Sequence, residues 1–169
     1  MATIAGFCHV GLAANDPAAL AAFYRDVLGM AVTGGSGADG PHGATAFLSS
    51  RPAEEDHELA IFADARYRHL AFKVASLADL RALYHQVIAH GIPIKLTMIH
   101  GRSLAFYFGD PEGNMIEVYW PTDLGKGRPD GERLDLAASD DELIAQVARI
   151  ASGTGRSLPP AQAATDSTP

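Results

Sequence analysis

The chain has 169 residues, of which 47% are hydrophobic and 20% charged, and its formal net charge is −7 at neutral pH. This length and hydrophobic content suit one domain with a sizeable core. The acidic balance, without a visible basic patch, argues against nucleic acid as the main partner, because phosphate backbones bind to a concentrated basic face.

The sequence also lacks the usual marks of a membrane or secreted protein. No apolar run approaches the roughly 20 residues that span a bilayer, and the N-terminus has neither the basic start nor the long apolar stretch of a signal peptide. A single cysteine, Cys8, excludes an internal disulfide and fits a reducing compartment. We therefore expect a cytoplasmic protein that does not bind membranes.

The first part of the chain is predicted to form a strand, a helix and three further strands. Asp16 can cap a helix whose first-turn Pro17 has no amide hydrogen to lose, and Gly29 suits the left-handed position after its end. The apolar residues of this helix fall on one face, namely Leu20, Phe23, Tyr24, Val27 and Leu28. The strands after it are predicted over 31–34, 44–49 and 57–62.

The second part repeats this pattern, since residues 67–94 align with residues 7–32 at a period of about 60 residues. Ser76 followed by Asp79 resembles a capping box, and Gly91 ends the helix. Its predicted buried stripe consists of Leu80, Leu83, Tyr84, Val87 and Ile88. Strands follow over 93–99, 103–108 and 114–120.

The composition changes after residue 120. Residues 121–133 are rich in glycine, proline and charge and read as a surface loop. Ser139 can cap a short helix ending near Ile150, which would cover the open end of a cavity or pack on a second subunit. We expect a single domain over 1–150, with modules of about 4–63 and 64–121 and an extension over 122–150, followed by a flexible tail over 151–169.

Alternation along the strands separates their side chains into two faces. One face carries apolar sets that would pack against the helices: Cys8, Val10 and Leu12; Leu70, Phe72 and Val74; Ile116, Val118 and Trp120. The other face carries His9, His69 and Glu117, accompanied by Tyr67, Lys73 and Tyr119. His57 is predicted to share one strand face with Leu59 and Ile61, and Tyr107 to lie opposite the apolar residues of its strand.

Two histidines and one glutamate on a shared face predict a metal site. A single histidine in an apolar strand is more often a core residue, but His9 and His69 occupy equivalent points of the repeat. Glu117 lies in an otherwise buried strand, where a carboxylate without a partner costs several kcal/mol. Two imidazoles and a carboxylate leave one face of the metal open, as is typical of non-haem Fe(II) oxygenases.

The pattern resembles the vicinal oxygen chelate superfamily over residues 4 to about 121. The strongest element is residues 103–120, SLAFYFGDPEGNMIEVYW, in which a turn containing Pro111 and Gly113 leads into the strand with Glu117. The resemblance implies an α+β fold in which two paired βαβββ modules form a curved mixed sheet around a metal cavity. The helix near the C-terminus would add to this fold.

Within the superfamily, the chain is most similar to type I extradiol catechol dioxygenases. This likeness implies that His9, His69 and Glu117 bind the metal and that the enzyme opens an aromatic diol with O2. It favours Fe(II), with Mn(II), Ni(II) or Zn(II) as alternatives, and a homo-oligomer, dimer or larger.

The likeness also assigns three side chains around the metal. His57 matches the family's acid/base histidine beside the substrate, and Tyr107, ten residues before Glu117, matches its active-site tyrosine. His100 resembles a further substrate-binding histidine but lies closer to the tyrosine than is usual. The residues alone leave simpler interpretations open. His57 follows an acidic run and could be a solvated residue at the start of a strand, and Tyr107 could simply fill space, because tyrosine is common in strands. The other histidines, His42, His85 and His90, receive no role.

Other members of the superfamily provide alternative functions. A glyoxalase-like isomerase would need a fourth ligand, for which the sequence offers His57 or Glu58. Thiol transferases carry threonine where this chain has Gly11 and arginine where it has Tyr119. A metal-free sequestering protein would not need the complete ligand set.

Overall fold

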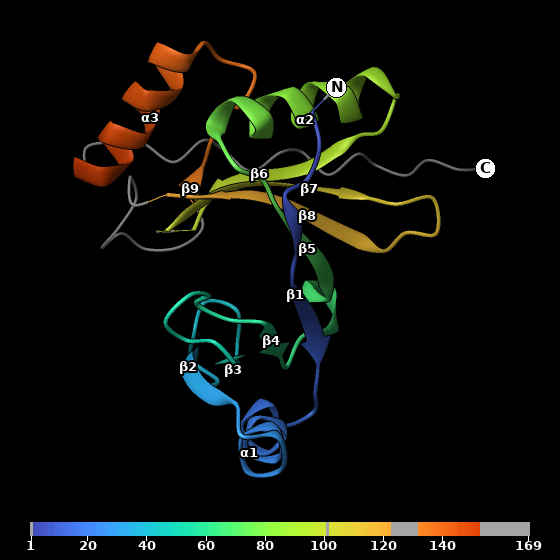
Figure 1. Cartoon of the computed structure of the whole chain (residues 1–169), viewed down its shortest axis with the longest axis vertical. Coiled ribbons are helices and arrows are strands. Elements are labelled where there is room, and N and C mark those ends of the chain that lie inside the picture. Colours follow the sequence, from blue (N-terminus) through green and yellow to red (C-terminus); the bar gives the residue numbers. More distant parts are fainter. Residues whose placement is uncertain (1, 101, 123–131, 153–169) are drawn as a thin grey trace.

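The computed structural model describes residues 2–100, 102–122 and 132–152. Within them, nine strands form one mixed sheet in the order β2-β3-β4-β1-β5-β8-β7-β6-β9 (Figure 1). The first module comprises β1 (Gly6–Ala13), α1 (Pro17–Leu28), β2 (Ala31–Ser36), β3 (Thr45–Ser49) and β4 (Leu59–Phe62). The second comprises the short helix η1 (Ala65–Tyr67), then β5 (His69–Lys73), α2 (Leu77–Ala89), β6 (Ile94–Ile99), β7 (Ser103–Gly109) and β8 (Met115–Pro121). The chain then adds β9 (Glu132–Arg133) and α3 (Asp140–Ser152).

The predicted repeat is confirmed by the strand pairing. In each module the first strand pairs in parallel with the last, β1 with β4 and β5 with β8. The two first strands then pair with each other in antiparallel fashion and join the modules into one sheet. As a result β1, β5 and β8, which carry the three predicted ligands, are neighbours at the centre of the sheet.

Helix caps that the sequence predicts are present. The Asp16 carboxylate accepts from the backbone N–H of Ala19, and Gly29 has a positive φ of 72°. The Ser76 hydroxyl accepts from the N–H of Asp79 at 3.1 Å. The Ser139 hydroxyl accepts from the N–H of Glu142 at 3.3 Å, and Glu142 in turn accepts from Ser139.

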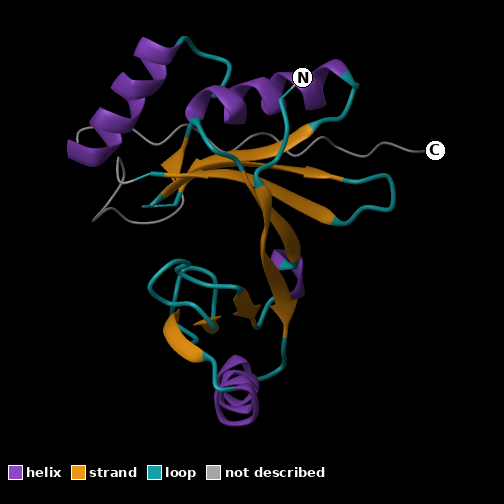
Figure 2. Ribbon diagram, viewed as in Figure 1, coloured by secondary structure: helices purple, strands orange, loops and turns teal. Residues whose placement is uncertain are grey.

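The helices cover the outer side of the curved sheet (Figure 2). Two cores of buried side chains lie between the sheet and the helices. Beneath α2 and α3 lies the larger core, built around Leu80, Ile99, Leu104, Phe106, Leu136, Leu143 and Val147. Beneath α1 lies a smaller core of Ala21, Ala46, Leu48 and Ile61. Because α3 inserts its apolar residues beside α2, the prediction that this helix covers the open end of the cavity is wrong. Its packing on a second subunit stays a prediction.

Only part of the apolar face predicted for α1 is buried. Leu20 and Tyr24 pack against the small core, but the side chains of Phe23, Val27 and Leu28 are 53%, 61% and 64% exposed. The helix approaches β3 through the short side chain of Ala21, which leaves its longer apolar neighbours outside. On α2, Ile88 is likewise exposed, although the stripe pattern predicted it to be buried. No helix in the described part of the chain is both long and apolar enough to cross a membrane.

Leu80→Ala should lower the free energy of unfolding by about 2–5 kcal/mol, because it opens a cavity in the larger core around a fully buried side chain. Leu28→Ala is the matched control and should cost less than about 1 kcal/mol, since this leucine is mostly exposed. Urea denaturation followed by circular dichroism measures both. Equal losses would contradict this assignment of the core.

Candidate metal centre

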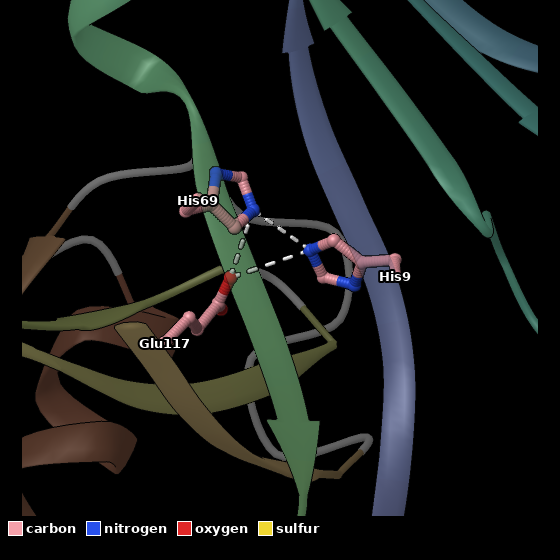
Figure 3. Close-up of side chains that lie close together, drawn as sticks. All are labelled: His9, His69 and Glu117. Carbon is pink, nitrogen blue, oxygen red and sulfur yellow. Dashed lines mark hydrogen bonds and ion pairs between the residues drawn. The ribbon is translucent and has the colours of Figure 1, made fainter. Parts of the chain in front are cut away.

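The register of three strands brings the predicted ligands together. His9 of β1 and Glu117 of β8 both stand opposite Ala71 of β5, and His69 stands opposite Gly11. Since directly paired residues in a sheet share a face, the three side chains converge on one side (Figure 3). The Nε2 atoms of the two histidines are 2.9 Å apart, and Glu117 Oε2 lies 3.4 Å from His9 Nε2 and 3.3 Å from His69 Nε2.

This triangle fits one metal ion. Ligand atoms bound at about 2.0–2.2 Å on one face of an ion are separated by distances of this size. Among the described residues, this is the group of three whose ligand atoms all lie within 4.8 Å of one another. The His69 Nδ1–H donates to the Tyr67 carbonyl at 2.7 Å, which orients the ring and leaves Nε2 for a metal.

Burial and charge set the protonation states of the group. Burial alone would raise the pKa of the Glu117 carboxyl, but the hydrogen bond from His9 and the charges of nearby histidines outweigh it and lower this pKa to about 2. Burial lowers the pKa of His69, so its imidazole is neutral at neutral pH. An anionic carboxylate and a neutral imidazole are the forms that bind a divalent cation.

The absence of a side chain at Gly11 makes room for the His69 ring. A Cβ atom there would lie 2.4 Å from His69 Nδ1 and 2.9 Å from the Tyr67 carbonyl oxygen. Any other residue would therefore displace either the ring or the backbone that orients it. A threonine at this position, as in the thiol transferases, does not fit this site.

The candidate centre lies in the wall of a cavity of about 940 Å³. His57, His100 and Tyr107 all line it, so the structure brings the predicted substrate-binding residues to the same cavity. Tyr107 stands opposite Glu117 in the sheet, and its hydroxyl lies 2.7 Å from His100 Nε2. The short spacing between His100 and Tyr107 thus still allows a direct hydrogen bond.

His57 reaches the site from a different position than predicted. Strand β4 begins only at Leu59, so the alternation does not extend back to His57. Ile61 and Leu59 point into the core beneath α1, whereas the His57 ring lies 4.3 Å from that of His9 and 5.1 Å from that of Phe47, measured between centroids. The predicted shared face is therefore wrong. Burial, followed by the charge of His9, lowers the pKa of His57 to about 3, so this imidazole is neutral.

The fourth ligand that a glyoxalase-like site would require is not supplied by Glu58. Its carboxylate accepts from the backbone N–H of Ser50 at 2.6 Å and from the Arg51 guanidinium at 3.0 Å. Since His9 and His69 are equivalent in the repeat, Gly11 is equivalent to Ala71, two residues further on. Ala71 pairs with Glu117, and Gly11 pairs with Ala60. The first-module equivalent of Glu117 is thus Ala60, which cannot bind a metal.

Cys8 also departs from prediction, because the pairing of β1 with β5 shifts register between Phe7 and His9. This bulge turns Cys8 away from the helices and toward the side of His9. There its sulfur accepts from the Tyr119 hydroxyl at 2.6 Å and its thiol donates to Glu55 at 3.3 Å. Glu55 in turn accepts from Lys73 at 2.8 Å. Burial raises the pKa of the Cys8 thiol, which is protonated at neutral pH.

Sequence reasoning missed His42 and Lys95, which both line the cavity. The His42 ring lies 5.0 Å from that of Tyr67, and its Nδ1 is buried without a hydrogen-bond partner in the described residues. It belongs to an irregular loop before β3, where periodicity gives no direction. Lys95 stands at a bulge in β6, and a regular alternation would not identify it.

Gly11→Ala should weaken divalent-metal binding at least about tenfold, because the added Cβ displaces His69 from its orienting hydrogen bond. Gly6→Ala is the matched control on the same strand, where a Cβ meets nothing within 4 Å, and its metal affinity should equal that of the unmodified protein. Calorimetric titration of the metal-free proteins with Zn(II) or Mn(II) gives both affinities. Unchanged affinity in Gly11→Ala would remove His69 from the ligand set.

Comparison with known proteins agrees with this geometry. The family profile described as Glyoxalase/Bleomycin resistance protein/Dioxygenase superfamily matches residues 6–118. The sequence is 32% identical over 122 residues to biphenyl-2,3-diol 1,2-dioxygenase 3 of Rhodococcus globerulus, covering 65% of this chain and 60% of that relative. The chain thus spans somewhat more than half the length of this relative.

Two solved structures share the fold at low sequence identity. A 2,3-dioxygenase from Pseudomonas sp. KL28 superposes with a TM-score of 0.60 at 17% identity, over 70% of this chain and 43% of the other. A Mn(II)-bound glyoxalase from Novosphingobium aromaticivorans superposes with a TM-score of 0.59 at 20% identity, over 89% of this chain and 54% of the other. From the profile match, the sheet topology and the His-His-Glu group, we conclude that the chain belongs to the glyoxalase, bleomycin resistance protein and dioxygenase superfamily.

Proposed function

We propose that the protein is an Fe(II)-dependent extradiol dioxygenase that cleaves a catechol-type ring with O2. The observation that carries the proposal is the facial group of His9, His69 and Glu117 in the wall of a cavity that also holds His57 and Tyr107. The 32% identical relative is named as a dioxygenase of an aromatic diol, which supports the same substrate class here.

In this proposal His9, His69 and Glu117 hold the metal, and the cavity side stays open for ligands. A bound divalent iron would supply a Lewis acid for the diol oxygens and a shared coordination sphere for diol and O2. The carboxylate balances part of the metal charge, and the aromatic wall of Phe47, Phe62 and Tyr107 suits a flat ring. The cavity volume of about 940 Å³ leaves room for a substituted ring.

His57 is the proposed acid/base group. Its neutral imidazole lies against His9, and a neutral imidazole can accept a proton from a catechol hydroxyl. A bound catecholate places negative charge beside this ring, which raises a histidine pKa and helps the ring to hold the proton. His57 can then donate this proton to an oxygen atom of the reacting species.

Tyr107 and His100 form the proposed substrate-orienting pair. Their hydrogen bond of 2.7 Å fixes the tyrosine hydroxyl on the cavity side of β7, opposite Glu117. From there the hydroxyl can donate its hydrogen to a substrate oxygen while it accepts from the His100 Nε2–H. Holding the pair in one orientation before binding reduces the entropy lost on reaching the reactive geometry.

The alternatives within the superfamily fit the chain less well. Of the two candidates for a fourth isomerase ligand, Glu58 is bound to Ser50 and Arg51. The other, His57, is outside the group whose ligand atoms all lie within 4.8 Å of one another, and Ala60 occupies the position equivalent to Glu117. A thiol-transferase site needs a side chain at Gly11, where none fits. A purely sequestering protein has no need for a buried His-His-Glu group.

Protein loaded anaerobically with Fe(II) and mixed with catechols and air should consume oxygen and form a yellow ring-opened product. Oxygen uptake and visible absorbance measure this. Glu117→Gln, which removes the anionic ligand, should give neither signal, and loading with Mn(II), Ni(II) or Zn(II) compares the other metals. No oxygen uptake with Fe(II) across a diverse panel of diols would refute the dioxygenase proposal.

His57→Ala should lower kcat by about 10²- to 10⁴-fold, the usual effect of removing an acid/base group, and should leave Fe(II) affinity nearly unchanged. His85→Ala on the exposed side of α2 is the matched control and should keep full activity. Metal content and steady-state kinetics are measured on the same samples. If His57→Ala lost metal and activity in parallel, this histidine would be a ligand instead.

A further inference from the structure

All but one of the lysines and arginines in the cavity wall form an ion pair with a carboxylate. Its lysines and arginines are Arg66, Lys73, Lys95 and Arg102. Three of them pair with a carboxylate: Arg66 with Asp64 at 2.6 Å, Lys73 with Glu55 at 2.8 Å and Arg102 with Asp56 at 3.0 Å.

The acidic side chains of the cavity wall already have partners other than Lys95. Besides Glu55 and Asp56, they are Glu54, which pairs with Arg51 at 3.2 Å, and Glu117 of the candidate centre. Among the described residues, Lys95 therefore remains the cation of the cavity wall without an anionic partner.

A bulge in β6 directs Lys95 toward the cavity. The pairing of β6 with β7 shifts register between Ile94 and Leu96, so Lys95 is the additional residue of the bulge. Leu96 and Met98, which follow it, line the cavity as Lys95 does. A regular strand would have placed Lys95 and Leu96 on opposite faces.

The ammonium group lies over Gly109 at the end of β7. A Cβ atom on Gly109 would be 3.1 Å from Lys95 Nζ and 3.4 Å from its Cε, so the missing side chain provides the space that the lysine occupies. Gly109 follows Tyr107 by two residues and therefore faces the same side of the sheet. It stands opposite Met115, which also lines the cavity and precedes Glu117 by two residues.

These positions set the distance between the ammonium and the candidate centre. Two residues along a strand span about 7 Å, and neighbouring strands are about 5 Å apart, so the backbone of Gly109, over which the ammonium lies, is on the order of 9 Å from the backbone of Glu117. A benzene ring whose diol oxygens lie at the centre can therefore direct a substituent along this side of the sheet toward Lys95.

We propose that Lys95 selects catechols that carry an anionic ring substituent, a carboxylate foremost, over neutral ones. The inference rests on the function proposed above in taking a catechol as the ligand. The Lys95 side chain is exposed, so solvent screens part of its charge. Its ammonium, which has no anionic partner among the described residues, still attracts an anion that a catechol brings into the same cavity. Its single charge on a flexible stem fits a carboxylate without demanding one geometry.

Binding to Zn(II)-loaded protein under argon tests the proposal without turnover. The probes are 3,4-dihydroxyphenylacetate and 3-(2,3-dihydroxyphenyl)propionate, each compared with its methyl ester, which has a similar shape and no charge. By calorimetry, the unmodified protein should bind at least one acid roughly five- to tenfold more tightly than its ester at low salt. The preference should shrink as the salt concentration rises.

Three variants separate charge from shape. Lys95→Met keeps an unbranched stem and should abolish the preference while leaving the ester affinities unchanged, whereas Lys95→Arg should retain it. Gly109→Val keeps the lysine but fills the space beneath its ammonium, and should reduce the preference.

The role of Lys95 would be overturned by an acid-to-ester ratio below about twofold in the unmodified protein, or by the same ratio in Lys95→Met as in the unmodified protein. Weak binding of every catechol would overturn it as well. If acids bind selectively but Fe(II)-loaded protein consumes no oxygen, the dioxygenase proposal fails and the inference about Lys95 stands.

Discussion

The contact between one buried carboxylate and two imidazoles is the constraint on which the site depends. Glu117 is 4% exposed and His9 is 6% exposed, and a buried anion is stable only with a positive partner or with donors. The parallel pairing of β5 with β8 and the antiparallel pairing of β1 with β5 place Glu117 and His9 opposite Ala71, on the same face as His69. The small side chain of Ala71 and the absence of one at Gly11 leave the room that the larger groups need. A one-residue slip in either pairing would send a ligand to the opposite face.

The elements that hold this register are those that obey simple local rules. Capped helices, alternating strands and the Asp-Pro-Glu-Gly turn before β8 were predictable, because each depends on near neighbours in the chain. In that turn Asp110 accepts from the backbone N–H groups of Glu112 and Asn114, and Gly113 has a positive φ of 84°. The three candidate ligands were predictable for the same reason, since the strand pairing is regular from His9 onward in β1 and throughout the pairing of β5 with β8. Because each module contains the same order of strands, the equivalent first strands, β1 and β5, pair with each other and join the two modules.

The sequence was less informative wherever the backbone departs from regular alternation. Bulges at Cys8 and Lys95 each add one residue to a strand: the first turns Cys8 to the side of the sheet that carries His9, and the second brings Lys95 to the cavity, where a period of two would not place it. His57 precedes β4, and His42 lies in a loop, so neither has a periodic neighbour to set its direction. On α1, the exposed positions of Val27 and Leu28 follow from how closely Ala21 approaches β3, which is a property of tertiary packing. The departures in strands and loops therefore concentrate around the cavity, whereas those on α1 lie on the far side of its core.

The broken symmetry of the repeat gives the centre its chemical character. Each module presents a histidine on its first strand, but the position that holds Glu117 in the second module holds Ala60 in the first. A symmetric pair would carry two histidines and two carboxylates and would surround a metal more completely. With alanine at that position, and with His57 beside His9 at the margin of the group, the cavity side stays free for exchangeable ligands. An open face suits a reaction in which two molecules meet at one ion, and it favours an oxygenase over an isomerase that needs the fourth protein ligand.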